Sequence, residues 1–430
     1  MGDLAARCGS AAMMPITAFR SVFFGWKVVA ASFTIAAFTF GVGLYGPSVF
    51  LNVLHQQRGW PVSVVSVGLT VHFLVSGILV ARLPDAHRRF GVAAVTQAGV
   101  AALVVGMFGW SLAGAPWQLF LAAILSGAGW AATSGAAIIA MVSPWFDRRR
   151  ALALGHAFNG ASVGGILFTP LWVMLIAAVG FPQAVAMIGC ATLVVLWPLA
   201  RWYLRPTPDS LGLLPDGSPA PPRPHVAVRT EHPPLRLAVL LADRGFITLS
   251  AAFALGLFAQ VGVIAHLVTR LVPLVGAVDA AAAVSLATAS AVIGRVLLGM
   301  LLGDANRRIV AAGNFTMQAC GVVLLAFGST AVMLVPGCIL FGLGIGSLLS
   351  LPPLIGQTEF APADVPRVVA LVTAVNQTVF AFAPAVFGVL TELSGGYVVP
   401  FLVAAAVQVI AAVVVIRGRV RSSGDQFARE

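Results

Sequence analysis

One arginine lies deep inside an apolar stretch of this chain, and it is the residue best placed to do chemistry. Nine residues separate Arg295 from Asp304, or about 13 Å of helix, so its guanidinium belongs well inside a membrane-length segment. All 14 acidic residues lie outside the apolar stretches or at their edges, so no carboxylate within a stretch can neutralise it. Inserting such a charge costs about 2.5–3.5 kcal/mol, and intramembrane charge usually marks a pathway. The planar fork of arginine suits a carboxylate, which predicts binding of a small anion. The alternative is an arginine that caps carbonyls of a neighbouring helix.

Three histidines also lie within apolar stretches: His72, His156 and His266. Imidazole can take up or release a proton near neutral pH, and no acidic side chain is available at that depth. We therefore expect His72 and His266 to be candidates for substrate binding. His72, the deepest, is the best candidate to carry a coupling proton. The alternative for each is a neutral, hydrogen-bonded packing residue.

Four further polar side chains in apolar stretches could hydrogen-bond a substrate: Asn159, Asn376, Gln377 and Tyr45. The two asparagines enter the apolar region to equal depth in the two halves of the chain. The alternative is that these residues hold neighbouring helices together through hydrogen bonds.

No group of residues typical of an enzyme is found. The chain has no metal-binding helix motif, no phosphate-binding loop and no acid within an apolar stretch that could act as a base. The four cysteines have no paired spacing that predicts a disulfide or a zinc site. We therefore expect no catalytic residues, no metal site and no cofactor.

The elements that must position the candidate residues are membrane-spanning helices. Hydrophobic residues make up 59% of the chain and charged residues 9%, whereas a soluble domain carries about 25% charged residues. So much apolar surface requires lipid as part of the solvent, and one span takes about 20 residues. Twelve apolar stretches fit this length: 26–54, 61–82, 91–113, 116–144, 151–179 and 182–204 in the first half, and 245–272, 280–302, 308–329, 332–358, 366–392 and 398–416 in the second.

The distribution of positive charge predicts how the chain crosses the membrane. With the N-terminus inside, cytoplasmic segments hold 22 of the 25 Lys and Arg residues, and external loops hold only Arg58 and Arg270. This bias favours an all-α integral membrane protein of twelve transmembrane helices in two six-helix bundles, with both termini cytoplasmic. It also explains the net charge of +11 without nucleic-acid binding. The expected domains are an N-terminal tail (1–22), a bundle (23–204), a proline-rich and partly disordered linker (205–244), a second bundle (245–418) and a C-terminal tail (419–430).

The two halves are related by an internal duplication. The pattern Asp-Ala-x-Arg-Arg at 85–89 recurs at 304–308. The pattern Arg-x-x-Ala-Leu-x-x-Ala-x-Asn at 150–159 recurs at 367–376. The two recurrences have nearly the same offset along the chain. They indicate paired halves, which transporters use for alternating access around a central site.

The loops after spans 2 and 8 resemble the signature of the major facilitator superfamily. Within it the chain is most similar to monocarboxylate porters and oxalate/formate antiporter-like proteins, on residues 25–29, 45–51, 58–60, 145–153, 160–164 and 211–217. The resemblance implies the major facilitator fold, and we expect a monomer. It also implies inner-face charges that bridge neighbouring helices in one state: Asp85, Arg88, Arg89, Asp304, Arg307 and Arg308. The alternative for these six residues is that they only set the topology.

The chain departs from this group at several positions. Ala81 stands where the loop motif usually has glycine, and Ala291 stands where monocarboxylate porters place an acid one turn before the span-8 arginine. Asn52 replaces a lysine near the outer end of span 1. Span 11 has Asn376 and Gln377 but lacks the lysine of oxalate/formate exchangers. The substrates of the group are therefore not carried over to this chain.

The leading hypothesis is a secondary active transporter of a small, monocarboxylate-like organic anion in the cell inner (plasma) membrane. Its partners would be that substrate and the lipid bilayer. The alternative is an exporter of amphipathic drugs or metabolites, because residues 160–165 faintly resemble the antiporter motif of span 5, with Ala161 in place of its proline. A third hypothesis, a transporter-like sensor, would require a cytoplasmic output domain, which the linker and tail are too short to provide.

Overall fold

A computed structural model describes residues 23–217, 237–301, 305–361 and 364–418 of the chain. All regular elements in these residues are helical. Both expected tails, the middle of the expected linker and Asp304 lie outside the described residues.

The helices of the first half are α1 (Phe24–Phe40), η1 (Gly41–Tyr45), α2 (Gly46–Arg58), α3 (Val62–Val80), α4 (Leu83–Phe90), α5 (Val92–Leu112), α6 (Pro116–Thr133), α7 (Gly135–Val142), η2 (Ser143–Trp145), α8 (Arg150–Val179) and α9 (Phe181–Tyr203). The linker contains η3 (Asp209–Leu211), η4 (Pro215–Gly217) and α10 (Leu237–Ala242). The second half contains α11 (Arg244–Leu301), α12 (Arg307–Phe327), α13 (Ala331–Ile345), α14 (Leu351–Glu359), α15 (Val365–Phe380), α16 (Ala383–Ser394) and α17 (Val398–Ile416).

Ten of the described segments are long and apolar enough to cross a membrane. One of them, α11, contains two passes, because the backbone turns at Gly276 with φ 81° and ψ 167°. A further pass begins with the shorter apolar helix α13 and continues through a turn into α14. The described residues therefore form twelve passes, which we number spans 1 to 12 in chain order.

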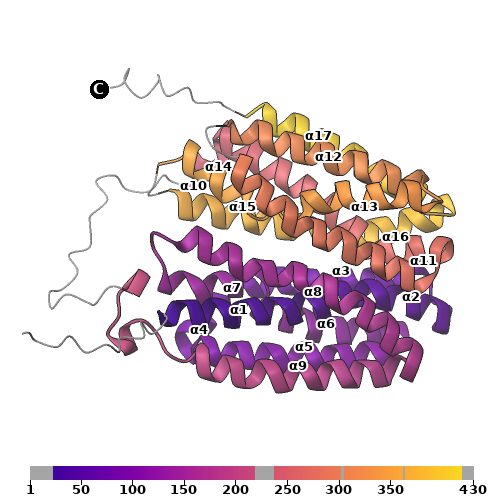
Figure 1. Ribbon diagram of the computed structural model, residues 1–430, viewed down its shortest axis with the longest axis horizontal. Helices are drawn as coiled ribbons and strands as arrows, with labels where there is room; N and C mark the ends of the chain where they lie inside the picture. The colour runs from indigo at the N-terminus through magenta and orange to yellow at the C-terminus, as the bar shows by residue number, and fades with distance from the viewer. Residues whose placement is uncertain (1–22, 218–236, 302–304, 362–363, 419–430) are drawn as a thin grey trace, which may run out of the picture.

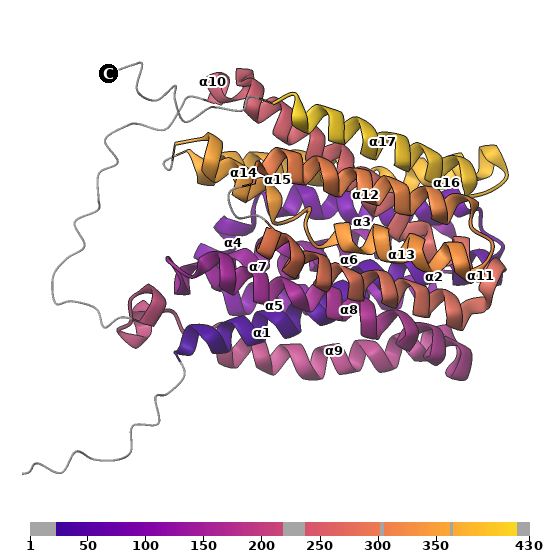
Figure 2. The ribbon, with the colours of Figure 1, turned by 45° about the horizontal axis from the view of Figure 1, so that its top comes forward.

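The passes form two bundles that lie side by side, with α1–α9 in one and α11–α17 in the other (Figures 1 and 2). This arrangement confirms the expected fold class. Span 7 is α11 up to Gly276, span 8 is the rest of α11, and span 11 is α15 followed by α16.

Span 1 contains a five-residue π-helical turn, η1, between α1 and α2. Pro47 follows it and has no N–H to donate to the carbonyl four residues earlier, so a regular α-helix cannot continue here. The wider turn leaves the Gly41 carbonyl to accept from the Gly46 N–H and from Trp172 Nε1, the latter at 3.0 Å. Single π-turns of this kind are frequent at functional sites. The turn places Tyr45 at the point where span 1 faces the other bundle.

Spans 4 and 10 occupy the same position in the two halves, and both are interrupted. Span 4 breaks at Ser134 (φ −95°, ψ −155°), between α6 and α7. Span 10 breaks over residues 346–350, between α13 and α14. Helix breaks at corresponding positions of paired halves are typical of transporter binding regions. Such breaks leave backbone N–H and C=O groups near the middle of the membrane without partners in their own helix, so these groups can bind a ligand.

Candidate functional site

The two bundles meet along two helix pairs that the internal duplication relates. Span 5 (α8) packs against span 8, and span 2 (α3) packs against span 11. In the first pair Ser285 Oγ donates to the Ile166 carbonyl at 2.9 Å. In the second pair the Ala385 N–H donates to Thr70 Oγ1 at 3.0 Å. A site shared by both bundles must therefore lie between these two pairs.

Arg295 is partly buried on span 8 and connects three passes. Its Nη1 donates to the side-chain oxygen of Asn159 on span 5, and its Nε donates to the Gly346 carbonyl on span 10 at 3.3 Å. Both acceptors are neutral. In the part of the chain that the structure describes, no carboxylate lies within ion-pair distance of this guanidinium. A buried charge held only by neutral groups is incompletely compensated and favours an anion nearby.

The break in span 10 provides one of these acceptors. Gly346 ends α13, and the last carbonyls of a helix have no partner within the helix and attract a cation. A Cβ at this position would lie 2.4 Å from the Ala291 carbonyl oxygen and 3.2 Å from Arg295 Nη2. Glycine therefore allows span 8 and its arginine to approach the broken helix closely.

Tyr45 reaches the same region from span 1 and is 3% exposed. Its phenol and the Arg295 guanidinium are close enough to interact electrostatically. Gly165 on span 5 makes room for it, because a Cβ there would lie 2.7 Å from Tyr45 Cζ and 2.4 Å from the Thr288 methyl carbon. The structure thus brings three of the predicted site residues together: Tyr45, Asn159 and Arg295.

Gln377 and Asn376 lie on span 11, in the other interface between the bundles. Gln377 Nε2 donates to Ser76 Oγ of span 2 at 3.3 Å. Asn376 is 5% exposed, and its side-chain oxygen is buried without a hydrogen-bond partner in the part of the chain that the structure describes. The duplication relates this interface to the first, since its first repeat aligns Ser76 with Arg295 and its second aligns Asn159 with Asn376. The candidate site is therefore charged on one side and neutral on the other.

The predicted histidines lie away from the groups that Arg295 contacts. His72 is fully buried inside the first bundle, where its Nδ1 is 2.8 Å from Ser126 Oγ and its Nε2 has no hydrogen-bond partner among the described residues. His266 lies between the bundles, with its Nε2 3.1 Å from the Pro384 carbonyl and 3.5 Å from Ser66 Oγ. His156 packs edge-on against the Trp26 ring. These contacts suit neutral packing residues and leave a proton-carrying role for His72 as a hypothesis.

The first inner-face charge cluster is exposed. Arg88 pairs with Asp85 at 2.5 Å within one helical turn, and their side chains are 78% and 65% exposed. Arg89 lies over the Phe90 ring. None of these contacts reaches another helix.

The second cluster is built into the second bundle. The Arg308 side chain is 2% exposed and forms a two-pronged ion pair with Glu359, at 2.5 and 2.7 Å. It also donates to Thr248 Oγ1 and to the carbonyls of Gly245 and Val415. Arg307 donates to the Leu354 carbonyl. Arg308 therefore ties together the ends of spans 7, 9, 10 and 12 at one end of the second bundle.

Sequence reasoning missed the groups that complete the site. Thr288 and Ser285 were overlooked because hydroxyl side chains are common in spans and carry no charge. Ser76 could have been found, since the offset between the two Asp-Ala-x-Arg-Arg repeats maps it onto Arg295. Within the described residues, no group of three or more His, Cys, Asp or Glu side chains could hold a metal ion.

A protein family described as the Major Facilitator Superfamily matches residues 31–360 of the chain. The chain is 26% identical to monocarboxylate transporter 13 of Rattus norvegicus, over 89% of this chain and 86% of that protein. It is 29% identical to monocarboxylate transporter 3 of the same organism, over 90% of this chain and 78% of that protein. A crystal structure of a mutant of the nucleoside transporter NupG has a similar fold, with a TM-score of 0.69 at 13% identity, covering 91% of this chain and 99% of the other.

Proposed function

The chain belongs to the major facilitator superfamily of membrane transporters, and on this premise we propose that it moves a small, monocarboxylate-like organic anion by alternating access. The observation that carries the proposal is the position of Arg295. This cation lies between the bundles and contacts neutral acceptors on both of them. A substrate carboxylate would provide the negative charge that these acceptors lack.

The guanidinium has the geometry to hold a carboxylate through two parallel hydrogen bonds. Asn159 accepts from Arg295 Nη1, so an incoming carboxylate would replace the amide oxygen at that donor. A charged acceptor binds a guanidinium more strongly than a neutral one. The exchange would release span 5 from span 8 when the anion arrives, and this is how binding would be linked to movement of the bundles.

The relatives support the same class of substrate. Two of them, each aligned over most of this chain, are named monocarboxylate transporters. At the position where such porters place an acid, this chain has Ala291, which is fully buried. We propose that charge balance is achieved either by exchange of one anion for another or by a histidine such as His72.

We further propose that the protein works as a monomer in the plasma membrane with both termini cytoplasmic. The charge distribution supports this orientation, with 22 of 25 basic residues on one side. Single cysteines placed at Pro215 and Asp425, in a background without the native cysteines, should react with a membrane-impermeant reagent only after the cells are opened. Labelling of either position in intact cells would contradict the orientation.

The function is tested with purified protein in proteoliposomes. Uptake of a panel of labelled small carboxylates should exceed that of matched amides and of amphipathic cations. Transport of amphipathic cations without carboxylates would instead support an exporter.

A further inference from the structure

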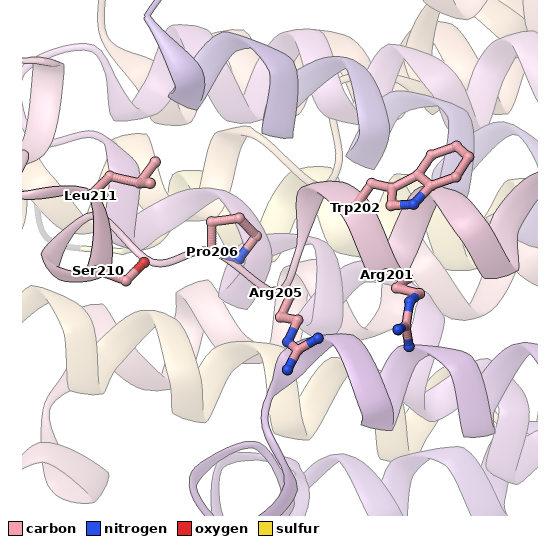
Figure 3. A pocket seen from close by; sticks show the side chains of 6 residues that line it. All are labelled: Arg201, Trp202, Arg205, Pro206, Ser210 and Leu211. Carbon is pink, nitrogen blue, oxygen red and sulfur yellow. The ribbon is translucent and has the colours of Figure 1, made fainter.

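A cavity of about 510 Å³ lies where span 6 ends and the linker begins. It is far from the inter-bundle site in the chain and shares no residue with it. Its lining residues come from the end of α9 and from the linker around η3: Arg201, Trp202, Arg205, Pro206, Ser210 and Leu211 (Figure 3).

Two arginines give the cavity its charge. Arg201 lies in the last turn of α9 and Arg205 lies just beyond the helix end, and Figure 3 shows both side chains pointing the same way. Both are exposed, and neither forms an ion pair with a carboxylate of the described residues. Two guanidinium forks that pair with no carboxylate of the described residues suit the oxygens of a phosphate group.

The opposite wall is an ordered part of the linker. Ser210 accepts from the Thr207 N–H at 2.9 Å, and the Leu213 N–H donates to the Pro208 carbonyl at 3.0 Å. These bonds close a compact turn that places Ser210 and Leu211 against the end of span 6.

Asp216 fixes this wall to the first bundle. It has a left-handed backbone conformation (φ 63°), and its carboxylate accepts from the N–H groups of Asp147, Arg148 and Arg149 at 3.2, 2.9 and 3.4 Å. Desolvation raises the pKa of the Asp216 carboxyl, but the three backbone hydrogen bonds and the nearby Arg149 charge together outweigh it and lower the pKa below its ordinary value. These bonds fix the described start of the linker, residues 205–217, to the first bundle.

The cavity lies at the level of lipid headgroups. Span 6 covers Phe181–Tyr203, and 23 residues of helix measure about 34 Å, slightly more than the hydrocarbon core. Its last residues must therefore lie at the membrane boundary. Trp202 is 66% exposed there, turned away from the two arginines (Figure 3). An exposed tryptophan beside basic residues is typical of the interface between lipid and water.

We propose that this cavity binds the phosphate of an anionic phospholipid headgroup through Arg201 and Arg205. The acyl chains of the lipid would lie along span 6, and Trp202 would rest at the headgroup level beside it. The site does not depend on the proposed substrate. A free phosphate has the same chemistry but lacks the chains that would hold it at this depth.

The test titrates the detergent-solubilised full-length protein with short-chain phosphatidylglycerol and follows the melting temperature. Parallel titrations use phosphatidylcholine and inorganic phosphate. We expect phosphatidylglycerol to stabilise the protein and the other two to leave the melting temperature unchanged at equal concentration. An equal shift with inorganic phosphate would overturn the assignment to a lipid.

Variants locate the effect. R201Q/R205Q should weaken the binding of phosphatidylglycerol roughly 30-fold, the loss expected for two basic residues at a membrane surface. R82Q/R89Q removes the same charge from exposed positions outside the cavity and its supporting contacts, and should bind like the wild type. If R201Q/R205Q fails to fold, R201K/R205K keeps both charges and should still bind several-fold more weakly, since it lacks the forks. Equal weakening in the control variant, or wild-type affinity in the lysine variant, would overturn the proposal.

Discussion

Arg295 on span 8 donates a hydrogen bond to the side-chain oxygen of Asn159 on span 5, across the interface between the two bundles. In the other interface Ser76, which the duplication aligns with Arg295, accepts a hydrogen bond from Gln377, the neighbour of the residue aligned with Asn159. One interface thus contains a cation at this level, and the other contains only neutral groups. In the proposed mechanism, this asymmetry lets a single anion be recognised within a nearly symmetric fold.

Gly165→Ala should push the bundles apart beside the candidate site. The added Cβ would lie 2.4 Å from the Thr288 methyl carbon and 2.7 Å from the Tyr45 ring. Overpacking of this kind costs about 1–3 kcal/mol, so this arrangement of the bundles should lose stability. The measurement is the melting temperature, together with the yield of a short bismaleimide cross-link between cysteines placed at Ser63 and Glu392, where the Glu392 carboxylate accepts from the Ser63 N–H across the interface.

Gly155→Ala is the matched control on the same helix, since nothing lies within 4 Å of the Cβ that it adds. It should leave both readouts unchanged. If the two variants behave alike, the contact at Gly165 does not set how closely the bundles approach.

Glu359→Ala should destabilise the second bundle strongly. It removes the carboxylate from a pair in which the arginine side chain is 2% exposed, and breaking such a buried pair typically costs about 3–5 kcal/mol. Asp85→Ala breaks the exposed Asp85–Arg88 pair of the first bundle and should cost no more than about 1 kcal/mol. Thermal unfolding of the two purified variants checks the difference. Losses of equal size would mean that the second cluster is no more than a topology signal.

His72→Gln tests whether this histidine carries a coupling proton. The glutamine side chain can keep a hydrogen bond to Ser126, but it does not titrate between about pH 5 and 8. If His72 is the carrier, the pH dependence of uptake should flatten over that range. Ser126→Ala, which removes the contact and keeps the imidazole, should shift the profile without flattening it. An unchanged profile in His72→Gln would remove this residue from the mechanism and favour anion exchange.

The sequence was sufficient to predict the twelve passes and the two bundles, because hydropathy and the distribution of arginines both depend on the membrane itself. It also singled out Arg295, since a charge at that depth is conspicuous. That Asn159 is its partner could not be predicted, because Asn376 has the same local pattern and only the packing of α8 against span 8 separates the two.

The irregular parts of the structure were harder to foresee. The π-turn before Pro47 and the break in span 10 both leave a backbone carbonyl that accepts a hydrogen bond from another helix. Trp172 donates to the Gly41 carbonyl, and Arg295 donates to the Gly346 carbonyl. The ordered part of the linker depends on Asp216 reaching amides of the loop before span 5, which lies far away in the sequence. Local sequence patterns do not contain such information.

The central claim is that Arg295 binds the carboxylate of the substrate. Arg295→Ala should leave the protein folded and inserted, because removing an isolated charge lowers the cost of insertion. Arg295→Lys keeps the charge but loses the fork, and it should weaken binding markedly. A purely structural arginine would show the reverse pattern, with poor yield of Arg295→Ala and normal affinity in the molecules that fold.

The most direct measurement is the thermal shift that a transported carboxylate induces in the wild type, in Arg295→Lys and in Arg295→Ala, each purified in detergent. We predict a clear shift in the wild type, a much smaller one with lysine and none with alanine, at similar yields of folded protein. A wild-type shift in Arg295→Ala would contradict the account.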